Sequence, residues 1–279
     1  MTAGYHLGDS ALGDRLRKEI EGDVLFDAFS RGRYSTDASH YQIEPIGVIV
    51  PRTEQDVRRA IQIASDAGVP VLPRGGGTSQ CGQTVGEALV IDVSKHMNQI
   101  LDFDPDNESV TVQPGVALDQ LNGFLGRQGY MFMVDVSTSS RATIGGMTGN
   151  NSCGARSIRY GTMRDNVNTV DATLADGRAF RFGALPTDLS TLDNSNGYRD
   201  IATRLIGLGT READEIRAKF PPLMRRVGGY NIDALVPGMS NRPGAVNGNL
   251  AHLLVGSEGT LAFSTQVGLK LHRLPAHKV

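Results

Sequence analysis

The sequence predicts an α+β fold with two lobes, in which a small parallel βαβ lobe packs on a larger mixed and antiparallel lobe with flanking helices. First, an apolar run at 46–50, a stretch of helical periodicity and a second apolar run at 69–73 follow one another, as in a parallel βαβ unit. Second, alternating residues at 109–113 and a turn at 176–177 indicate antiparallel strands further along the chain. Third, 279 residues suffice for one large domain or two lobes.

Composition excludes several classes of protein. The chain has 28 Lys and Arg against 30 Asp and Glu, so it has no overall field to attract nucleic acid or anionic lipid. It contains no apolar run of about 18 residues and no signal-peptide pattern. We therefore expect a cytoplasmic protein without a transmembrane segment, with peripheral membrane association through partners left open. Two cysteines, Cys81 and Cys153, are too few for an Fe–S or zinc site of its own, and no metal is predicted.

We expect three segments along the chain. Residues 1–40 form an N-terminal helix and arm, because charged and apolar residues follow a mixed helical spacing over 10–29 before a polar stretch. Residues 41–105 form the first lobe. The second lobe spans 106–275 and carries a helical and loop insertion at about 185–249.

Three apolar runs predict the strands of the first lobe, at 46–50, 69–73 and 88–93. The helix between the first two begins at Thr53, whose hydroxyl can accept the amide of Asp56 while the Asp56 carboxylate reaches back. Apolar residues at 57, 60, 61, 64 and 67 then form one face, and the helix ends at Gly68. This order favours a right-handed crossover between parallel strands.

Alternating and apolar runs predict the strands of the second lobe, at 109–113, in a hairpin at 170–182, at 250–255 and at 261–271. A helix over 116–129 is expected to turn Leu118, Leu121 and Leu125 inward. In the insertion, helical spacing predicts helices at about 198–207 and 211–220, and composition predicts a loop at 241–249.

The segment Arg74–Ser79 contains three consecutive glycines directly after a predicted strand. Glycine allows close approach and unusual backbone angles, so several amides can converge on an anion such as a pyrophosphate. The segment matches neither the P-loop pattern nor the G-x-G-x-x-G pattern, which disfavours a conventional ATPase or NAD(P)-binding unit. A tight structural loop is the alternative interpretation of this segment taken alone.

A second glycine-rich segment, 142–154, has four glycines among thirteen residues that are mostly small or polar. Such a segment cannot form a self-sufficient helix or strand, so we expect a loop wrapped on a ligand. Two nests of backbone amides could hold opposite stretches of one long ligand with a diphosphate at its centre, which describes a dinucleotide.

With these segments the chain resembles the FAD-binding (PCMH-type) domain of the vanillyl-alcohol oxidase/p-cresol methylhydroxylase flavoprotein superfamily, from about residue 46 to residue 271. The motifs that carry the resemblance are Pro51 with 54–57, then 74–79, 113–115, 142–146, 160–161 and 256–261. Within the superfamily, 142–161 looks most like the FAD-linked D-2-hydroxy-acid dehydrogenases, which include D-lactate, glycolate and D-2-hydroxyglutarate enzymes.

The resemblance implies an FAD site. It implies that 74–79 holds the pyrophosphate, that 143–154 lines the ribityl and isoalloxazine side, and that 114–115 and 258–259 complete the pocket. The cofactor-binding residues implied are Pro73, Arg74, Gly75, Gly76, Gly77, Thr78, Ser79, Gln83, Thr84, Pro114, Gly115, Val116, Asp135, Ser139, Thr143, Gly145, Gly146, Asn150, Ser152, Gly154, Tyr160, Gly161, Glu258 and Gly259.

Two departures from the family pattern matter. Relatives with a covalently attached flavin carry a His in the first glycine loop, where this chain has Thr78, Ser79 and Gln80, so the resemblance implies non-covalent FAD. The chain also stops at Val279, where family members continue into a cap domain that covers the flavin. We therefore expect the substrate cap domain to be absent, and the catalytic residues stay unknown.

The resemblance implies the FAD-binding portion of a flavin-dependent oxidoreductase that oxidises a D-2-hydroxy acid by hydride transfer to flavin N5 and is inactive alone. Its implied partners are FAD, a small 2-hydroxy acid reached through a cap domain, and an electron-acceptor protein or an Fe–S domain or subunit. One alternative is a cofactor-binding module or subunit without turnover unless a cap domain or partner chain completes it. Another keeps the fold but takes electrons from a nicotinamide cofactor, as enoyl-type reductases do.

Several side chains have two interpretations each. Cys153 could be redox-active or a packed thiol, and His252 could transfer protons or be a satisfied core histidine. Tyr230 could donate to an oxyanion or simply pack in its loop. Three arginines could neutralise a carboxylate or phosphate or lie on the surface: Arg156, Arg159 and Arg164.

Overall fold

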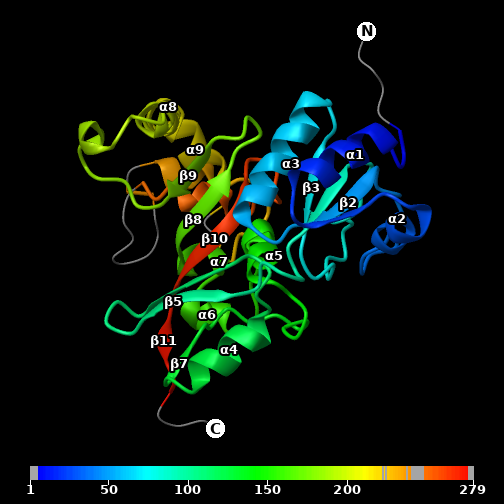
Figure 1. The fold of residues 1–279 in the computed structure, drawn as a ribbon. Coiled ribbons are helices and arrows are strands. Elements are labelled where there is room, and N and C mark those ends of the chain that lie inside the picture. Colours follow the sequence, from blue (N-terminus) through cyan, green and yellow to red (C-terminus); the bar gives the residue numbers. More distant parts are fainter. Residues whose placement is uncertain (1–5, 222, 224, 237, 240–247, 276–279) are drawn as a thin grey trace.

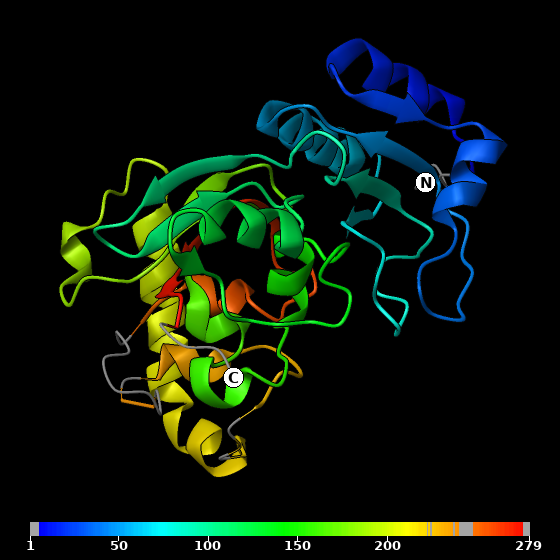
Figure 2. The same cartoon turned by 90° about the horizontal axis from the view of Figure 1, so that it is seen from below.

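The structure, a computed structural model, describes residues 6–221, 223, 225–236, 238–239 and 248–275. The chain forms two lobes that occupy separate regions in space (Figure 2). The first lobe runs from residue 6 to about the end of β4 (Leu89–Asp92), and the rest of the described chain builds the second. The two-lobed α+β fold predicted from the sequence is confirmed.

The first lobe is built on a four-stranded sheet with the order β1-β2-β4-β3. Three of its strands are parallel, as the βαβ pattern predicts: β2 (Gly47–Val50), β4 (Leu89–Asp92) and β3 (Val71–Arg74). β4 lies between the other two, so the crossover through α3 (Glu54–Asp66) skips one strand position. Strands β2 and β4 are buried along their whole length, because α3 and neighbouring elements cover the sheet.

The predicted single helix at 10–29 is wrong. The segment forms α1 (Ser10–Glu19), the strand β1 (Asp23–Leu25) and α2 (Ala28–Tyr34). β1 pairs antiparallel with β2, and Gly22 lies so close to the Val50 carbonyl that a Cβ would overlap it. Edge pairing therefore ends the helix, because strand hydrogen bonds replace helical ones where the chain meets the sheet.

The N-terminus of α3 follows the predicted cap in part. The Thr53 hydroxyl accepts the amide of Asp56 at 3.1 Å. The Asp56 carboxylate does not return to Thr53; it accepts the amides of Arg52 and Glu21, each at 2.8 Å. The side chain thereby ties the start of α3 to the chain that leaves α1.

The second lobe is built on a five-stranded antiparallel sheet with the order β5-β6-β10-β8-β9. Its strands are β5 (Ile100–Asp104), β6 (Ser109–Val112), β8 (Val167–Thr173), β9 (Ala179–Phe182) and β10 (Phe263–Lys270). The 170–182 hairpin and the strands at 109–113 and 261–271 are confirmed. β5 was not predicted, because Leu101 and Asp102 are exposed and the strand has no apolar run.

Helices and short strands surround this sheet (Figure 1). In α4 (Leu118–Gly126), Leu118, Leu121 and Leu125 are buried as predicted. The other elements of the second lobe outside its insertion are β7 (Tyr130–Met131), α5 (Ile144–Asn150), α6 (Ser157–Tyr160), α7 (Met163–Asn166), α10 (Ala251–Leu254) and β11 (His272–Arg273). The prediction of a strand at 250–255 is wrong. The Asn249 side chain accepts the amide of Ala251, and the helical turn α10 starts there.

The insertion consists of η1 (Leu189–Thr191), α8 (Tyr198–Arg211), α9 (Ala213–Lys219) and η2 (Ile232–Leu235). Its two predicted helices are confirmed. Most of the loop predicted at 241–249 lies outside the described residues. None of the helices in the described part of the chain combines the length and apolar character needed to cross a bilayer.

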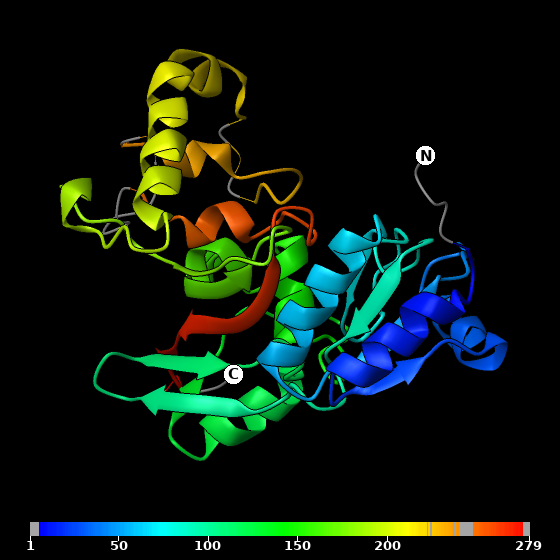
Figure 3. The same ribbon diagram turned by 45° about the horizontal axis from the view of Figure 1, so that its top comes forward.

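Strand β10 joins the two lobes. Phe263 at its start packs in the core cluster of the first lobe, while Val267 and Leu269 belong to the core of the second. The Gln266 amide donates to the Glu54 carboxylate of α3 at 2.6 Å. Figure 3 shows α3 between the first sheet and β10, so the last long strand fixes the distance between the lobes.

Candidate cofactor site

A cavity of about 220 Å³ lies between the lobes. Its walls are the loop after β3, one side of α5 and the turn before β10. Most residues predicted to bind the cofactor line it: Pro73, Arg74, Gly75, Gly76, Gly77, Thr78, Ser79, Gln83, Thr84, Pro114, Thr143, Gly145, Gly146, Asn150, Ser152, Glu258 and Gly259.

The remaining predicted residues lie outside this lining: Gly115, Val116, Asp135, Ser139, Gly154, Tyr160 and Gly161. Gly115 lines a neighbouring cavity of about 410 Å³. The Asp135 carboxylate accepts the amide of Arg156 at 3.0 Å and touches Gly154, so this pair holds the end of the second glycine segment. Contact between these residues and a cofactor stays a prediction.

The loop Gly75–Ser79 presents free backbone amides. Among the hydrogen bonds of the described residues, none has an amide of positions 75–79 as its donor. The loop is fixed by other groups, since the Gly77 carbonyl accepts the amide of Ala38. The loop is partly exposed, with Gly76 exposed and its neighbours of intermediate burial, and consecutive free amides in a glycine loop form a concave site for an anion.

The Arg74 side chain, directly before this loop, ties neighbouring segments of the chain together. Its guanidinium donates to the carbonyls of Tyr34, Thr84 and Thr36 at 3.2, 3.0 and 2.7 Å. It also lies over the Tyr34 ring. Burial lowers the pKa of Arg74, but a guanidinium keeps its charge in proteins. Arg74 therefore contributes positive charge beside the loop, while its N–H groups hold the end of α2 and the backbone at Thr84 in place.

The second glycine segment contains the helix α5, so the prediction of a loop is wrong. Thr143 caps α5 by accepting the amide of Gly146 at 3.3 Å. The amides of Ile144 and Gly145 donate to Val116 and Pro114, each at 2.8 Å. Tertiary partners and the burial of Ile144 thus override the low helix propensity of glycine. Because these amides are occupied, α5 provides a surface for a ligand and not a second amide nest.

The turn Gly256–Thr260 closes the cavity against the end of α5. The amides of Gly256 and Glu258 donate to the carbonyls of Thr148 and Gly149, each at 2.9 Å. Glu258 and Gly259 both have left-handed backbone angles, with φ of 54° and 76°. Such a conformation costs energy for Glu and clusters at functional sites. It places the Glu258 side chain at the cavity. Partial desolvation there raises the pKa of Glu258, and a hydrogen bond from Gln83 opposes this rise.

Part of the lining was not predicted from the sequence, including Val93, Val136, Thr138, Ser257 and Phe263. Ser257 lies inside the motif at 256–261, so the signal for it was present. The apolar residues come from strand ends and helix faces whose local pattern only indicates burial. Their position at the cavity depends on how the two lobes meet.

Other side chains for which the sequence suggested a functional role do not line the cavity. Cys81 and Cys153 are free thiols, one exposed and one partly buried. The Nε2 of His252 donates to the Val167 carbonyl at 3.2 Å, and burial lowers the pKa of His252 to about 4, which supports the core interpretation. Arg164 pairs with Asp233 at 2.7 Å. No group of His, Cys, Asp and Glu suited to a metal occurs among the described residues.

Tyr230 is 45% exposed, and its hydroxyl lies 2.7 Å from the Thr260 hydroxyl. Thr260 in turn donates to the Ser257 carbonyl at 2.6 Å. Because the single Thr260 proton is used there, Tyr230 must be the donor in its own hydrogen bond. The phenol proton is therefore not free to donate to an oxyanion.

Comparison with known proteins identifies relatives of this chain. The profile of a family described as FAD binding domain matches residues 45–183. D-2-hydroxyglutarate dehydrogenase of Escherichia coli is 36% identical over 263 residues, which cover 91% of this chain and 25% of that protein. Glycolate oxidase subunit GlcD of Bacillus subtilis is 38% identical over 199 residues, which cover 67% of this chain and 42% of that protein.

A solved structure of an alkyldihydroxyacetonephosphate synthase superposes with a TM-score of 0.66 and 19% identity, covering 96% of this chain and 41% of that one. At this identity the match shows the fold alone. The chain spans about a quarter of the length of the D-2-hydroxyglutarate dehydrogenase that it matches.

Proposed function

Residues 45–183 belong to the FAD binding domain family, and from this membership we propose that the chain is the FAD-binding part of a flavin-dependent oxidoreductase that oxidises a D-2-hydroxy acid. FAD is the cofactor that both the family and the sequence motifs indicate. The substrate class is supported by the names of two relatives, a D-2-hydroxyglutarate dehydrogenase and a glycolate oxidase subunit.

The observation that carries the proposal is the row of free amides at Gly75–Ser79 beside a cavity between two lobes. These amides fit the diphosphate of FAD, because they supply donors without adding side-chain bulk. Arg74 adds positive charge behind the loop. The α5 surface and the Glu258 turn form the other walls of the same cavity.

When bound, FAD supplies hydride acceptance at the flavin, and the protein binds and orients it. In this chain, Gly75–Ser79 would hold the diphosphate, and the α5 face with Thr143 and Gly146 would lie along the rest of the cofactor. Strand β10 keeps the two walls at a set separation through Phe263 and Gln266. The substrate cap and the catalytic base are proposed to come from other polypeptide.

We test the proposal by reconstituting the protein with FAD and mixing it anaerobically with D-2-hydroxyglutarate, D-lactate or glycolate. The experiment uses this chain alone and the full polypeptide or partner complex that contains it. Bleaching of the flavin by one hydroxy acid in the larger assembly is the expected result. Bleaching by NADPH with none by any hydroxy acid would instead support a nicotinamide-dependent reductase.

A second candidate is a cofactor-binding module or subunit that has no turnover until a cap domain or partner chain completes it. The share of the relatives' length that this chain spans, about 25%, favours this candidate for the chain alone. An electron-acceptor protein, or an Fe–S domain or subunit, is then a proposed partner. FAD binding without bleaching in this chain, together with bleaching in the larger assembly, is the expected signature.

A further inference from the structure

The segment Arg225–Val236, called here the strap, contacts both loops that form one side of the cofactor cavity. The Arg225 guanidinium donates to the Gly154 carbonyl at 3.0 Å, and the Asn151 side chain donates to the Arg226 carbonyl at 3.4 Å. At the other loop, the Asn231 side chain donates to the Val255 carbonyl at 2.7 Å. The strap thus spans from the end of α5 to the turn before β10.

The residues that the strap touches alternate along the chain with residues that line the cavity. Asn151 lies between Asn150 and Ser152, which both line it, and Val255 comes two positions before Ser257. The strap therefore supports the two loops from the side that faces away from the cavity. Asn151 is itself the left-handed C-cap of α5, with φ of 53°, a conformation that Asn adopts readily, and its side-chain contacts join this cap to the strap.

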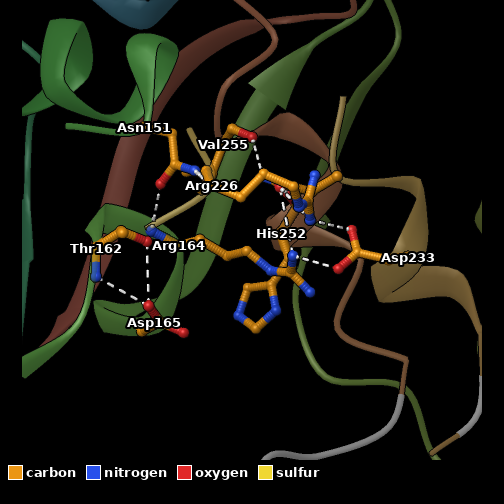
Figure 4. A network of polar contacts seen from close by, with 9 residues as sticks. Asn151, Thr162, Arg164, Asp165, Arg226, Asp233, His252 and Val255 are labelled. Atoms are coloured by element: carbon orange, nitrogen blue, oxygen red, sulfur yellow. Dashed lines mark hydrogen bonds and ion pairs between the residues drawn. The ribbon is translucent and has the colours of Figure 1, made fainter. Parts of the chain in front are cut away.

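Asp233 holds the strap in place through two arginines (Figure 4). Arg164 of α7 donates to one carboxylate oxygen at 2.7 Å. Arg226 lies 2.7 Å from the other oxygen, an ion pair by distance without hydrogen-bond geometry. The side chains are only 15%, 15% and 11% exposed for Arg164, Arg226 and Asp233. The amide of Arg164 donates to the Asn151 side chain at 3.0 Å, which extends the contact to α5.

The charges in this cluster make Asp233 its least replaceable member. Two buried guanidiniums share one carboxylate, and both also reach the Asn231 side-chain oxygen, at 3.3 and 3.4 Å. Without the carboxylate, two like charges would face each other out of water, which is strongly unfavourable. The arginines would then separate, and the strap would lose its contact with α7 and with Asn151.

We propose that Asp233 is a positioning residue of the FAD cavity, which acts through Arg164 and Arg226 to hold the strap against Asn151 and Val255. The proposal rests on FAD binding and not on the hydroxy-acid chemistry. If the unaltered protein bound no FAD, the proposed function would fail, whereas a difference between variants concerns Asp233 alone.

The test compares Asp233→Asn with the matched change Asp214→Asn in the same insertion, where the side chain is fully exposed and pairs with Arg217 at 3.3 Å. FAD dissociation constants are measured by flavin fluorescence below the unfolding temperature of every variant. Asp233→Asn is expected to weaken FAD binding about ten-fold or more, because it removes the compensation of a buried cluster. Asp214→Asn is expected to stay within about two-fold of the unaltered protein.

A second readout separates positioning from a general loss of stability. At saturating FAD, the visible circular dichroism of the bound flavin should differ in Asp233→Asn and return with Asp233→Glu. If Asp233→Asn does not fold, Arg226→Gln is measured instead. It removes one of the two arginines through which Asp233 holds the strap and leaves the ion pair of Arg164 with Asp233, so FAD binding is expected to weaken. Unchanged FAD affinity and an unchanged flavin spectrum in the folded variants, or an equal effect of Asp214→Asn, would overturn the proposal.

Discussion

Gly75 lies directly against Thr143, so close that a Cβ at position 75 would overlap the Thr143 hydroxyl. The neighbouring Gly76 lies in the same way against the Arg141 carbonyl. These contacts join the free-amide loop of the first lobe to the cap of α5 in the second lobe. The two predicted cofactor segments therefore form one continuous wall, and the glycines are needed for this packing as well as for an anion.

We predict that Gly75→Ala weakens FAD binding by about ten-fold or more, because the added methyl forces the loop away from Thr143 and disturbs its amides. Isothermal titration calorimetry with FAD measures the change. Gly123→Ala in α4 is the matched control, since nothing lies within 4 Å of a Cβ there. It should raise the free energy of unfolding by about 0.5–1 kcal/mol and leave the affinity for FAD unaltered. Equal FAD affinities in Gly75→Ala and Gly123→Ala would contradict the prediction that the contact between Gly75 and Thr143 shapes the cofactor site.

We predict that the flavin is bound without a covalent bond. Within the described part of the chain, no His, Cys or Tyr side chain lines the cavity, and these are side chains that could form such a bond. Acid precipitation of the FAD-loaded protein should release all of the yellow colour into the supernatant. Colour retained in the washed pellet would show that a residue outside this lining is attached.

We predict that His252 makes the protein less stable at acidic pH. Burial lowers its pKa to about 4, against about 6.5 for an unfolded histidine. Between these values the unfolded chain binds more protons than the fold, so the free energy of unfolding falls as the pH drops through this window. The loss is on the order of 2–3 kcal/mol.

Urea unfolding at several pH values checks this prediction. His252→Gln should flatten the curve between pH 6.5 and about 4, because its amide can still donate to the Val167 carbonyl without titrating. His40→Gln, at an exposed position, should keep the slope of the unaltered protein. Parallel curves for the unaltered protein and His252→Gln would assign the acid sensitivity to other groups.

We predict that Tyr230→Phe leaves FAD affinity unchanged. The phenol donates to Thr260, and its loss removes one exposed hydrogen bond, which costs about 0.5–1 kcal/mol of stability at most. The Asp233 cluster would still hold the strap. Thermal unfolding and FAD titration of Tyr230→Phe and of the exposed control Tyr41→Phe measure both effects. A large loss of affinity in Tyr230→Phe alone would place the phenol at the cofactor.

Local patterns were sufficient for elements whose hydrogen bonds and burial are set by nearby residues. The strand at 46–50, the Thr53 cap and the inward leucines of α4 are examples. The triple glycine at 75–77 also indicated its role from the sequence, because few roles other than a tight turn or an anion site require three consecutive glycines. The motif order from this loop to residues 256–261 was enough to indicate FAD.

Other features depended on partners far away in the chain. α5 exists because Val116 and Pro114 accept its first amides, against the preference of its glycines. β1 replaces part of a helix because an edge of the first sheet was open to it. Asp233 meets Arg164 across 69 residues, and no local spacing could pair them. Periodicity and composition report what a segment prefers by itself, whereas long-range hydrogen bonds and buried charges decide which preference survives once the lobes meet.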